Sequence, residues 1–316
     1  MRVLFVGTPK YAVPVLESVL RAGHQVVGVV TQPDKPLGRS STLVPTPIKS
    51  LADRCRIPVL QPPSLRAPGV YQAINGMSPE VLVVAAYGKL IPLPILNCFP
   101  GKILNIHPSL LPKYRGPSPI VTAILEGETR TGVTIMALDE GMDTGPILRQ
   151  KAERILDTDT TVGLTDRLFR IGSDLMLEVL HDLEMGEISA VPQDSTSATV
   201  TKMVRKADGI LDFGLPAEHL YRQLRAYQPW PGVYTYWGGR VLRVLAGSPL
   251  ATGSYLDQNV VGQVVALEGT GSSPMAIVTS DGLFALEWLQ LEGKLPTDSS
   301  QFLRGYPQFI GSQLGL

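Results

Sequence analysis

Two polar side chains end an apolar run in KILNIHPSLLPKYRG, residues 102–116. Asn105 and His107 are two positions apart, so on a strand both leave the same face. An amide can donate to a developing oxyanion, and an imidazole can take or give a proton near neutral pH. The alternative is that both residues only close the strand through hydrogen bonds. Pro108 and the proline-rich loop that follows favour a site, because prolines fix a loop beside the pair.

A second polar cluster follows another apolar run, in LDEGMDTGPIL at residues 138–148. Asp139, Glu140 and Asp143 could form an ordinary solvated turn, and their spacing does not match a calcium loop. A carboxylate beside His107 could hold the imidazole charged or relay a proton. The chain has no G-x-S-x-G elbow and no cysteine in a nucleophile-like setting. These residues therefore indicate acyl transfer directly between two bound substrates.

The elements that must position these residues alternate along the first half. Apolar runs rich in β-branched residues predict buried strands at 3–6, 26–30, 81–85, 103–107 and 133–138. Helical spacing or helix-start signals lie at 11–22, 46–55, 64–75, 117–126 and about 161–184. This order predicts an α/β fold with a Rossmann-like, mostly parallel sheet covered on both faces. Ligands bind outside the carboxyl ends of such strands, so residues from His107 and from Asp139 onward should meet there.

The second half has a different pattern of apolar runs and turn residues. After the Ser/Thr-rich stretch ISAVPQDSTSATVTK, short apolar runs are separated by Gly, Ser and Asp-Gly turns, which indicates a smaller antiparallel β-barrel. We therefore expect a catalytic domain at residues 1–189, a linker at 190–206 and an OB-like β-barrel at 207–316. The first strand-to-helix turn, VGTPKYAVP, has one glycine, so it does not support a dinucleotide site.

Composition excludes several classes of protein. Of the 316 residues, 44% are hydrophobic and 18% charged, and no uncharged apolar run is long enough to cross a membrane. The 28 basic and 28 acidic residues cancel, so bulk charge does not indicate a nucleic-acid partner. Cys55 and Cys98 form no CxxC pair, which fits a reducing compartment and argues against structural zinc. The N-terminus has no signal-peptide pattern, and we expect a cytoplasmic protein.

These motifs together resemble a known family. The run NIHPSLLPKYRGPSPI, with Asp143 36 residues after His107, is similar to the signature of enzymes that take the formyl group of 10-formyltetrahydrofolate. The stretches RVLFVGTPKYAVPVLESVL, VVGVVTQPDKPLGR and RAYQPWPGVYT resemble the methionyl-tRNA formyltransferase family. Glycinamide ribonucleotide formyltransferases share the Asn, His and Asp trio, but they are shorter and lack the C-terminal barrel.

The resemblance implies a role for each matching position. The catalytic trio is Asn105, His107 and Asp143. The folate site comprises Tyr87, Gly88, Ser109, Leu110, Leu111, Pro112 and Asp139. The residues expected to contact tRNA are Arg39 in PLGRSSTLVP and a local basic cluster of Lys202, Arg205 and Lys206. A second basic cluster supplies further candidates: Arg222, Arg225, Arg240 and Arg243. Relatives often have lysines after the loop arginine, whereas this chain continues Ser40, Ser41 and Thr42.

The reaction implied is transfer of the formyl group to the α-amino group of methionine on initiator methionyl-tRNA, giving N-formylmethionyl-tRNA. In this hypothesis Asn105 and a protonated His107 stabilise the oxyanion, and Asp143 favours the charged imidazole. No covalent enzyme intermediate, no metal and no more than a monomer are expected. Two alternatives are a formyltransferase acting on an amino-sugar nucleotide and a non-catalytic folate-binding module. The complete trio argues against the module, and the PWPG-containing second half argues against the sugar acceptor.

Overall fold

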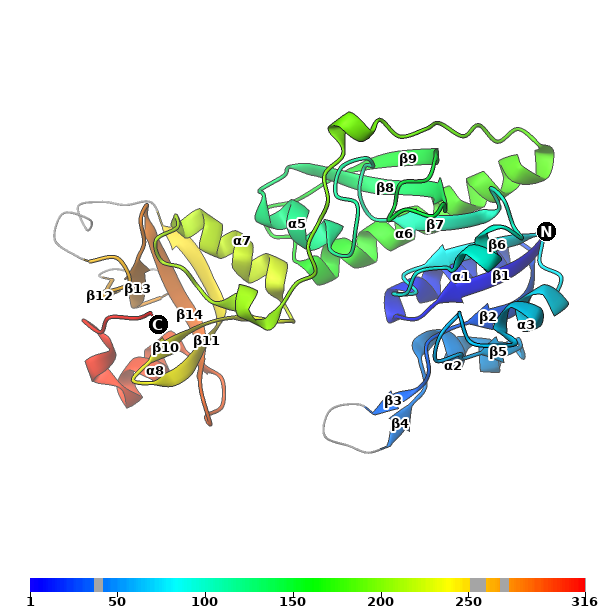
Figure 1. Ribbon diagram of the computed structural model, residues 1–316. Helices are drawn as coiled ribbons and strands as arrows, with labels where there is room; N and C mark the ends of the chain where they lie inside the picture. Colours follow the sequence, from blue (N-terminus) through cyan, green and yellow to red (C-terminus); the bar gives the residue numbers. More distant parts are fainter. Residues whose placement is uncertain (37–41, 251–259, 268–272, 316) are drawn as a thin grey trace. The chain divides into compact units, whose positions relative to one another are not determined.

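The computed structural model describes residues 1–36, 42–250, 260–267 and 273–315, which form two compact units (Figure 1). The first unit comprises residues 1–119, 129–155 and 163–202, and the second comprises 120–128, 156–162 and 203–316. These limits differ from the predicted domain limits of 1–189 and 207–316. Residues 190–202, the first part of the predicted linker, pack within the first unit, and two short segments of the first half belong to the second.

The first unit is built on a seven-stranded sheet with the order β5-β2-β1-β6-β7-β8-β9. The strands are β1 (Arg2–Gly7), β2 (Gln25–Val30), β5 (Val59–Leu60), β6 (Val81–Ala85), β7 (Ile103–His107), β8 (Arg130–Ala137) and β9 (Ile147–Arg154). Pairings from β5 to β7 are parallel, and those of β8 with β7 and β9 are antiparallel. A separate two-stranded ribbon joins β3 (Lys35–Pro36) to β4 (Leu43–Val44). The predicted Rossmann-like, mostly parallel sheet is confirmed.

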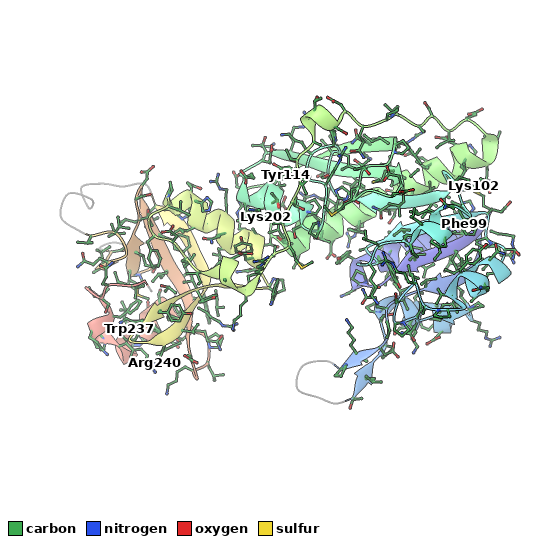
Figure 2. All side chains as sticks on the ribbon, in the orientation of Figure 1. Phe99, Lys102, Tyr114, Lys202, Trp237 and Arg240 are labelled. Atoms are coloured by element: carbon green, nitrogen blue, oxygen red, sulfur yellow. The ribbon has the colours of Figure 1, made fainter. Side chains whose placement is uncertain are left out.

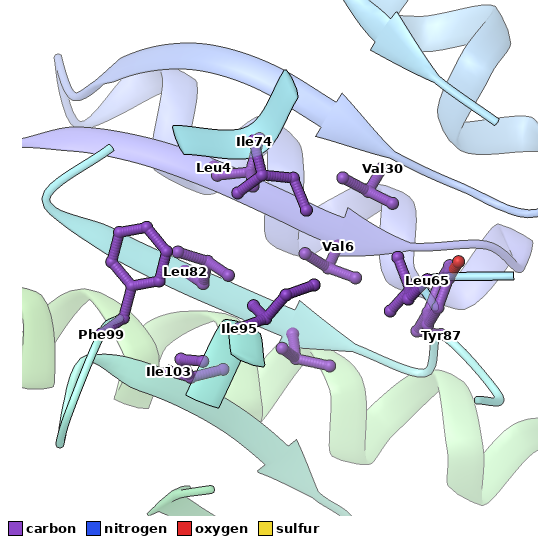
Figure 3. Close-up of a cluster of buried hydrophobic side chains, with 11 residues drawn as sticks. Leu4, Val6, Val30, Leu65, Ile74, Leu82, Tyr87, Ile95, Phe99 and Ile103 are labelled. Carbon is purple, nitrogen blue, oxygen red and sulfur yellow. The ribbon is translucent and has the colours of Figure 1, made fainter. Parts of the chain in front are cut away.

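Helices cover both faces of this sheet. They are α1 (Val13–Arg21), α2 (Pro47–Arg54), α3 (Val70–Gly76), α4 (Leu93–Leu96) and α6 (Thr161–Met185), with a 3-10 turn η1 (Lys10–Ala12) before α1. Ile74 of α3 and Ile95 of α4 pack with Leu82 and Ile103 in a buried cluster on one face (Figure 3). On the other face α6 lies so close that a Cβ added to Gly172 would be 2.7 Å from Ile106 Cγ2. The helix predicted at 64–75 begins only at Val70, after the Pro68-Gly69 break.

The second unit contains an antiparallel sheet with the order β10-β11-β14-β13-β12, and β15 pairs with β14. Its strands are β10 (Val233–Trp237), β11 (Arg240–Leu250), β12 (Val264–Ala266), β13 (Met275–Val278), β14 (Leu283–Leu291) and β15 (Thr297–Asp298). The unit also holds α7 (Ala217–Tyr227), α8 (Ser299–Gly305) and most of α5 (Pro119–Leu125). The rings of Trp237, Phe302 and Phe309 pack on one another, with centroids 5.0 to 6.0 Å apart. The sheet forms a half-barrel, in agreement with the predicted smaller β domain.

Within the described ranges, no helix is both long enough and apolar enough to cross a membrane.

Candidate active site

The trio does not assemble as the strand-end rule predicted. Because β8 runs antiparallel to β7, Ala137 pairs with Leu104, and the Leu138 N–H donates to the Ile103 carbonyl at 2.8 Å. The carboxyl end of β8 therefore lies beside the start of β7, not beside His107. The loop of residues 138–146 returns from that point and brings Asp143 to the imidazole. The expectation that Asp143 would reach the site from a neighbouring carboxyl strand end is thus wrong, although the residues still meet.

Strand β7 presents Asn105 and His107 on one face. Ile106, between them, points toward Gly172 of α6, so Asn105 and His107 leave the opposite face, as their spacing predicted. The Asn105 side chain is half-buried, and its amide has no hydrogen-bond partner among the described residues. A half-buried amide left without a protein partner is available to a ligand atom.

His107 is 4% exposed and has a polar partner on each side. Its Nε2 lies 2.9 Å from the Tyr114 carbonyl oxygen, and its Nδ1 lies 3.6 Å from Asp143 Oδ2. Because a carbonyl can only accept, Nε2 must carry the hydrogen. In the neutral imidazole Nδ1 is then unprotonated and faces the carboxylate.

Burial decides the charge state of His107. Desolvation holds the pKa of its imidazole below the ordinary value, although the Asp143 carboxylate and the Tyr114 carbonyl act to raise it. The resting imidazole is therefore more readily neutral than a solvated histidine. Burial thus acts against the protonated His107 of the hypothesis, and the sequence pattern showed the carboxylate but not the depth of burial.

The loop that carries Asp143 is held by backbone geometry. Asp143 has a left-handed backbone with φ of 55°, and its Oδ2 accepts the Gly116 N–H at 2.8 Å. Asp139 shapes the same loop, since its Oδ1 accepts from Gly141 N and Thr144 Oγ1 at 3.1 and 2.6 Å. A Cβ added to Gly145 would lie 1.9 Å from the Ala137 carbonyl oxygen, so only glycine fits where the loop meets β9.

Two family models match most of this chain. A family model described as formyl transferase matches residues 1–180, and one described as formyl transferase, C-terminal domain, matches 203–307. A methionyl-tRNA formyltransferase of Chloroflexus aurantiacus is 48% identical to this chain, with 96% of this chain and 97% of that protein covered. One of Desulforamulus reducens is 38% identical, with 100% and 98% covered. The chain belongs to the methionyl-tRNA formyltransferase family.

Two solved structures with low sequence identity share the fold. An N-formyltransferase of Helicobacter canadensis, solved with folinic acid and dTDP-3-aminofucose, has a TM-score of 0.64 at 19% identity, with 90% of this chain and 99% of that chain covered. HypX of Aquifex aeolicus with tetrahydrofolic acid has a TM-score of 0.65 at 18% identity, with 98% and 48% covered. The fold of this chain is thus shared with proteins that are much less similar in sequence.

The segment similar to the family's folate-contacting loop is tied to β8 and β9. Ser109 is fully buried and its Oγ donates to the Lys113 carbonyl at 2.6 Å, while Leu111 is 3% exposed. Thr134 Oγ1 donates to the Ser109 carbonyl at 2.7 Å and accepts from Leu111 N at 3.1 Å. The side chains of Ser109 and Leu111 thus hold the loop, whereas those of Leu110 and Pro112 are only partly buried.

Tyr87 and Gly88 lie in the loop that follows β6. The Tyr87 ring is 2% exposed and belongs to the core cluster of Figure 3, and its buried hydroxyl has no partner among the described residues. The Tyr87 carbonyl accepts from Gln32 Nε2 at 2.8 Å. Gly88 is exposed and has a φ of 77°. Gly88 rather than the Tyr87 side chain is therefore accessible to a ligand.

The basic residues expected to contact tRNA fall into three groups. Arg39 lies outside the described residues. Lys202 (labelled in Figure 2), Arg205, Lys206, Arg240 and Arg243 are exposed. Arg222 and Arg225 are partly buried and engaged within their own unit; Arg225 Nη1 donates to the Asp159 carbonyl at 3.0 Å and its guanidinium lies over the Tyr221 ring. These two arginines are therefore less available to a phosphate than the sequence suggested.

Several polar residues that build the site were missed in the sequence. Gln193 bonds to the Asp143 loop, Arg115 bonds to Gln193, and Thr134 and Gln150 hold the loop after β7. Gln193 lies in the Ser/Thr-rich stretch, whose lack of periodicity gave no sign that it packs. Among the described residues, no group of three or more His, Cys, Asp or Glu side chains is placed to hold a metal ion.

Proposed function

We propose that Asn105, His107 and Asp143 carry out the reaction of this family: transfer of the formyl group of 10-formyltetrahydrofolate to the α-amino group of methionine on initiator methionyl-tRNA. The observation that supports these roles is the unpartnered Asn105 amide on the same strand face as His107, whose Nδ1 is 3.6 Å from Asp143. A hydrogen-bond donor, a proton acceptor and a carboxylate are the groups that amine attack on a formyl carbon requires.

In this reaction a new bond joins the amine nitrogen to the formyl carbon, and the bond from that carbon to the folate nitrogen breaks. One proton leaves the attacking amine and one reaches the departing nitrogen. The amide N–H of Asn105 donates to the oxygen as it gains negative charge. A model α-amine has a pKa of about 8, so a useful fraction is unprotonated at neutral pH without a strong base.

His107 carries the proton between the two nitrogens. Its unprotonated Nδ1 accepts the proton from the attacking amine, and the imidazolium that forms is stabilised by the Asp143 carboxylate. The Tyr114 carbonyl fixes the ring orientation by accepting from Nε2. No covalent bond to the enzyme is needed, because the two substrates react directly.

The folate supplies the formyl group. The accessible parts of the predicted folate segments would hold it: Leu110 and Pro112 after β7, Gly88 after β6 and the loop of Asp139. The buried Ser109, Leu111 and Tyr87 contribute by fixing the backbone of those segments.

The tRNA would be held through phosphate contacts by Arg39, Lys202, Arg205 and Lys206. We also propose that the chain acts as a monomer in the cytoplasm. The two cysteines are free and exposed, which suits a reducing compartment.

The test is formyl transfer to methionyl-tRNA at saturating substrates by variants of the trio. Asn105→Ala should lower kcat on the order of 10²-fold while folate binding is retained, because its donor acts mainly in the transition state. Asn75→Ala, which changes an exposed asparagine of α3, is the matched control and should leave kcat unchanged. Near-normal turnover by Asn105→Ala would show that the oxyanion role is wrong.

A further inference from the structure

The segment of residues 191–201, after α6, contacts the backbone of the two residues that lie on either side of the His107 ring, Tyr114 and Asp143. Thr199 Oγ1 accepts from Tyr114 N at 2.8 Å, and the Thr199 carbonyl accepts from Arg115 N at 2.9 Å. Thr201 N donates to the Arg115 carbonyl at 2.8 Å. The Tyr114 carbonyl is the partner of His107 Nε2, so this segment fixes one side of the imidazole.

Gln193 fixes the other side. Its Nε2 donates to the carbonyls of Asp143 and Gly145 at 2.9 and 2.7 Å. Its Oε1 accepts from Arg115 Nε and Nη2 at 2.9 and 2.8 Å. The two donors and two acceptor sites of the amide are all used, which leaves the side chain no freedom to turn.

Arg115 determines which way the amide faces. It is 7% exposed, and it makes no ion pair with any residue that the structure describes. A guanidinium can only donate, so it must face Oε1, and Nε2 is then directed at the two carbonyls. Burying a cation whose partner is a neutral amide rather than a carboxylate costs free energy. The arrangement therefore indicates that the orientation it gives the amide matters.

The backbone that Gln193 and Thr199 hold would otherwise be unfavourable. Tyr114 and Asp143 both have left-handed backbones, with φ of 60° and 55°, which non-glycine residues rarely adopt. Such conformations persist where the surroundings over-determine them, and they concentrate at functional sites. In Asp143 this backbone directs Oδ2 toward both Gly116 N and His107 Nδ1.

We propose that Gln193, oriented by Arg115, is a positioning residue that holds the Asp143 carboxylate against His107. The stretch predicted as a linker thereby becomes part of the site. The consequence for rate rests on the proposed function, whereas the consequence for His107 itself does not.

The test measures the titration of His107 in the free protein by NMR of labelled histidines. Asp143 is the acidic group acting on His107; Lys113, Asp139 and Glu140, on the loops around it, are exposed. Asp143→Asn should lower the pKa of His107. Gln193→Met, which fills the same space without hydrogen bonds, should reproduce at least half of that shift, because the released carboxylate moves away. An unchanged His107 titration in folded Gln193→Met would overturn the proposal, since it would mean that Gln193 contributes stability only.

A second variant covers the case in which a buried, partnerless Arg115 unfolds the chain. Arg115→Met with Gln193→Met removes the cation together with the amide. Loss of a nearby cation alone would raise the pKa of His107, so the decrease that we expect cannot come from it. Thr196→Ala is the control and should leave the titration unchanged, because Thr196 lies on the same segment and its hydrogen bonds among the described residues go to Asp194.

Formyl-transfer kinetics then separate the two claims. Gln193→Met should lower kcat about 10-fold with little change in KM, as expected for a group that acts in the transition state. Combined with Asp143→Asn, it should cost nothing further, because both changes remove the same carboxylate effect. Independent, additive losses would contradict positioning through Asp143. If the NMR shift occurs but no variant, nor the unsubstituted chain, transfers formyl, the proposed function fails and the positioning role stands.

Discussion

At the scale of residues, His107 combines two opposed influences. Acceptors on both sides favour a doubly protonated ring, while burial favours a neutral one, and burial has the larger effect. A histidine in this position can take a proton during the reaction without keeping it. Asp143 then stabilises an imidazolium that forms during the reaction, rather than one that is present in the resting site.

This balance predicts a pH dependence with a definite sign. Because the folded pKa of His107 lies below the unfolded value of about 6.5, the unfolded chain binds the proton more readily. The contribution of the neutral ring to stability is therefore present above about pH 6.5 and lost as pH falls through the folded pKa. Chemical denaturation of the unsubstituted chain and of His107→Asn should show a difference in unfolding free energy that shrinks on acidification. A difference that grows would mean that the buried ring is charged.

The sequence allowed part of the site to be predicted at this scale. Asn105 and His107 were placed correctly on one face, because strand alternation is a property of the backbone itself. Gln193 and Arg115 could not be predicted, since their contacts join positions 78 residues apart in the chain and follow no local pattern. The charge state of His107 required its burial, which only the folded chain defines.

At the scale of elements, the strands and helices of the first half were predictable because buried runs have a clear composition. The direction of β8 was not, because a short apolar run looks the same in either direction. Strand β9 was also missed: its sequence, ILRQKAER, is polar and half-exposed at the sheet edge. The β8–β9 hairpin is nevertheless the element that brings Asp143 to His107.

Gly145 provides a test of this hairpin. In Gly145→Ala the new Cβ would overlap the Ala137 carbonyl, so the loop must shift. We expect a loss of about 1–3 kcal/mol in unfolding free energy, together with reduced kcat because Asp143 moves. Gly76→Ala, at the end of α3 where an added Cβ meets nothing within 4 Å, is the matched control and should be neutral or slightly stabilising. Equal stabilities in urea denaturation of the two variants would contradict the close approach.

At the scale of the whole molecule, neither composition nor net charge indicated a nucleic acid. The 28 basic and 28 acidic residues cancel, and the exposed basic residues form small local groups. The two-part organisation was predictable from the change in texture along the chain, and its limits were not, because residues 190–202 pack with the first unit. Family membership, rather than bulk electrostatics, identifies the acceptor as a tRNA.

The central claim is tested most directly by offering two acceptors to the chain at once. One reaction contains labelled 10-formyltetrahydrofolate, initiator methionyl-tRNA and an amino-sugar nucleotide at equal concentrations, with Asn105→Ala as the background control. We predict that the label enters N-formylmethionyl-tRNA and that the sugar nucleotide gains none above background. Label on the sugar nucleotide, or on neither acceptor, would contradict the proposed function.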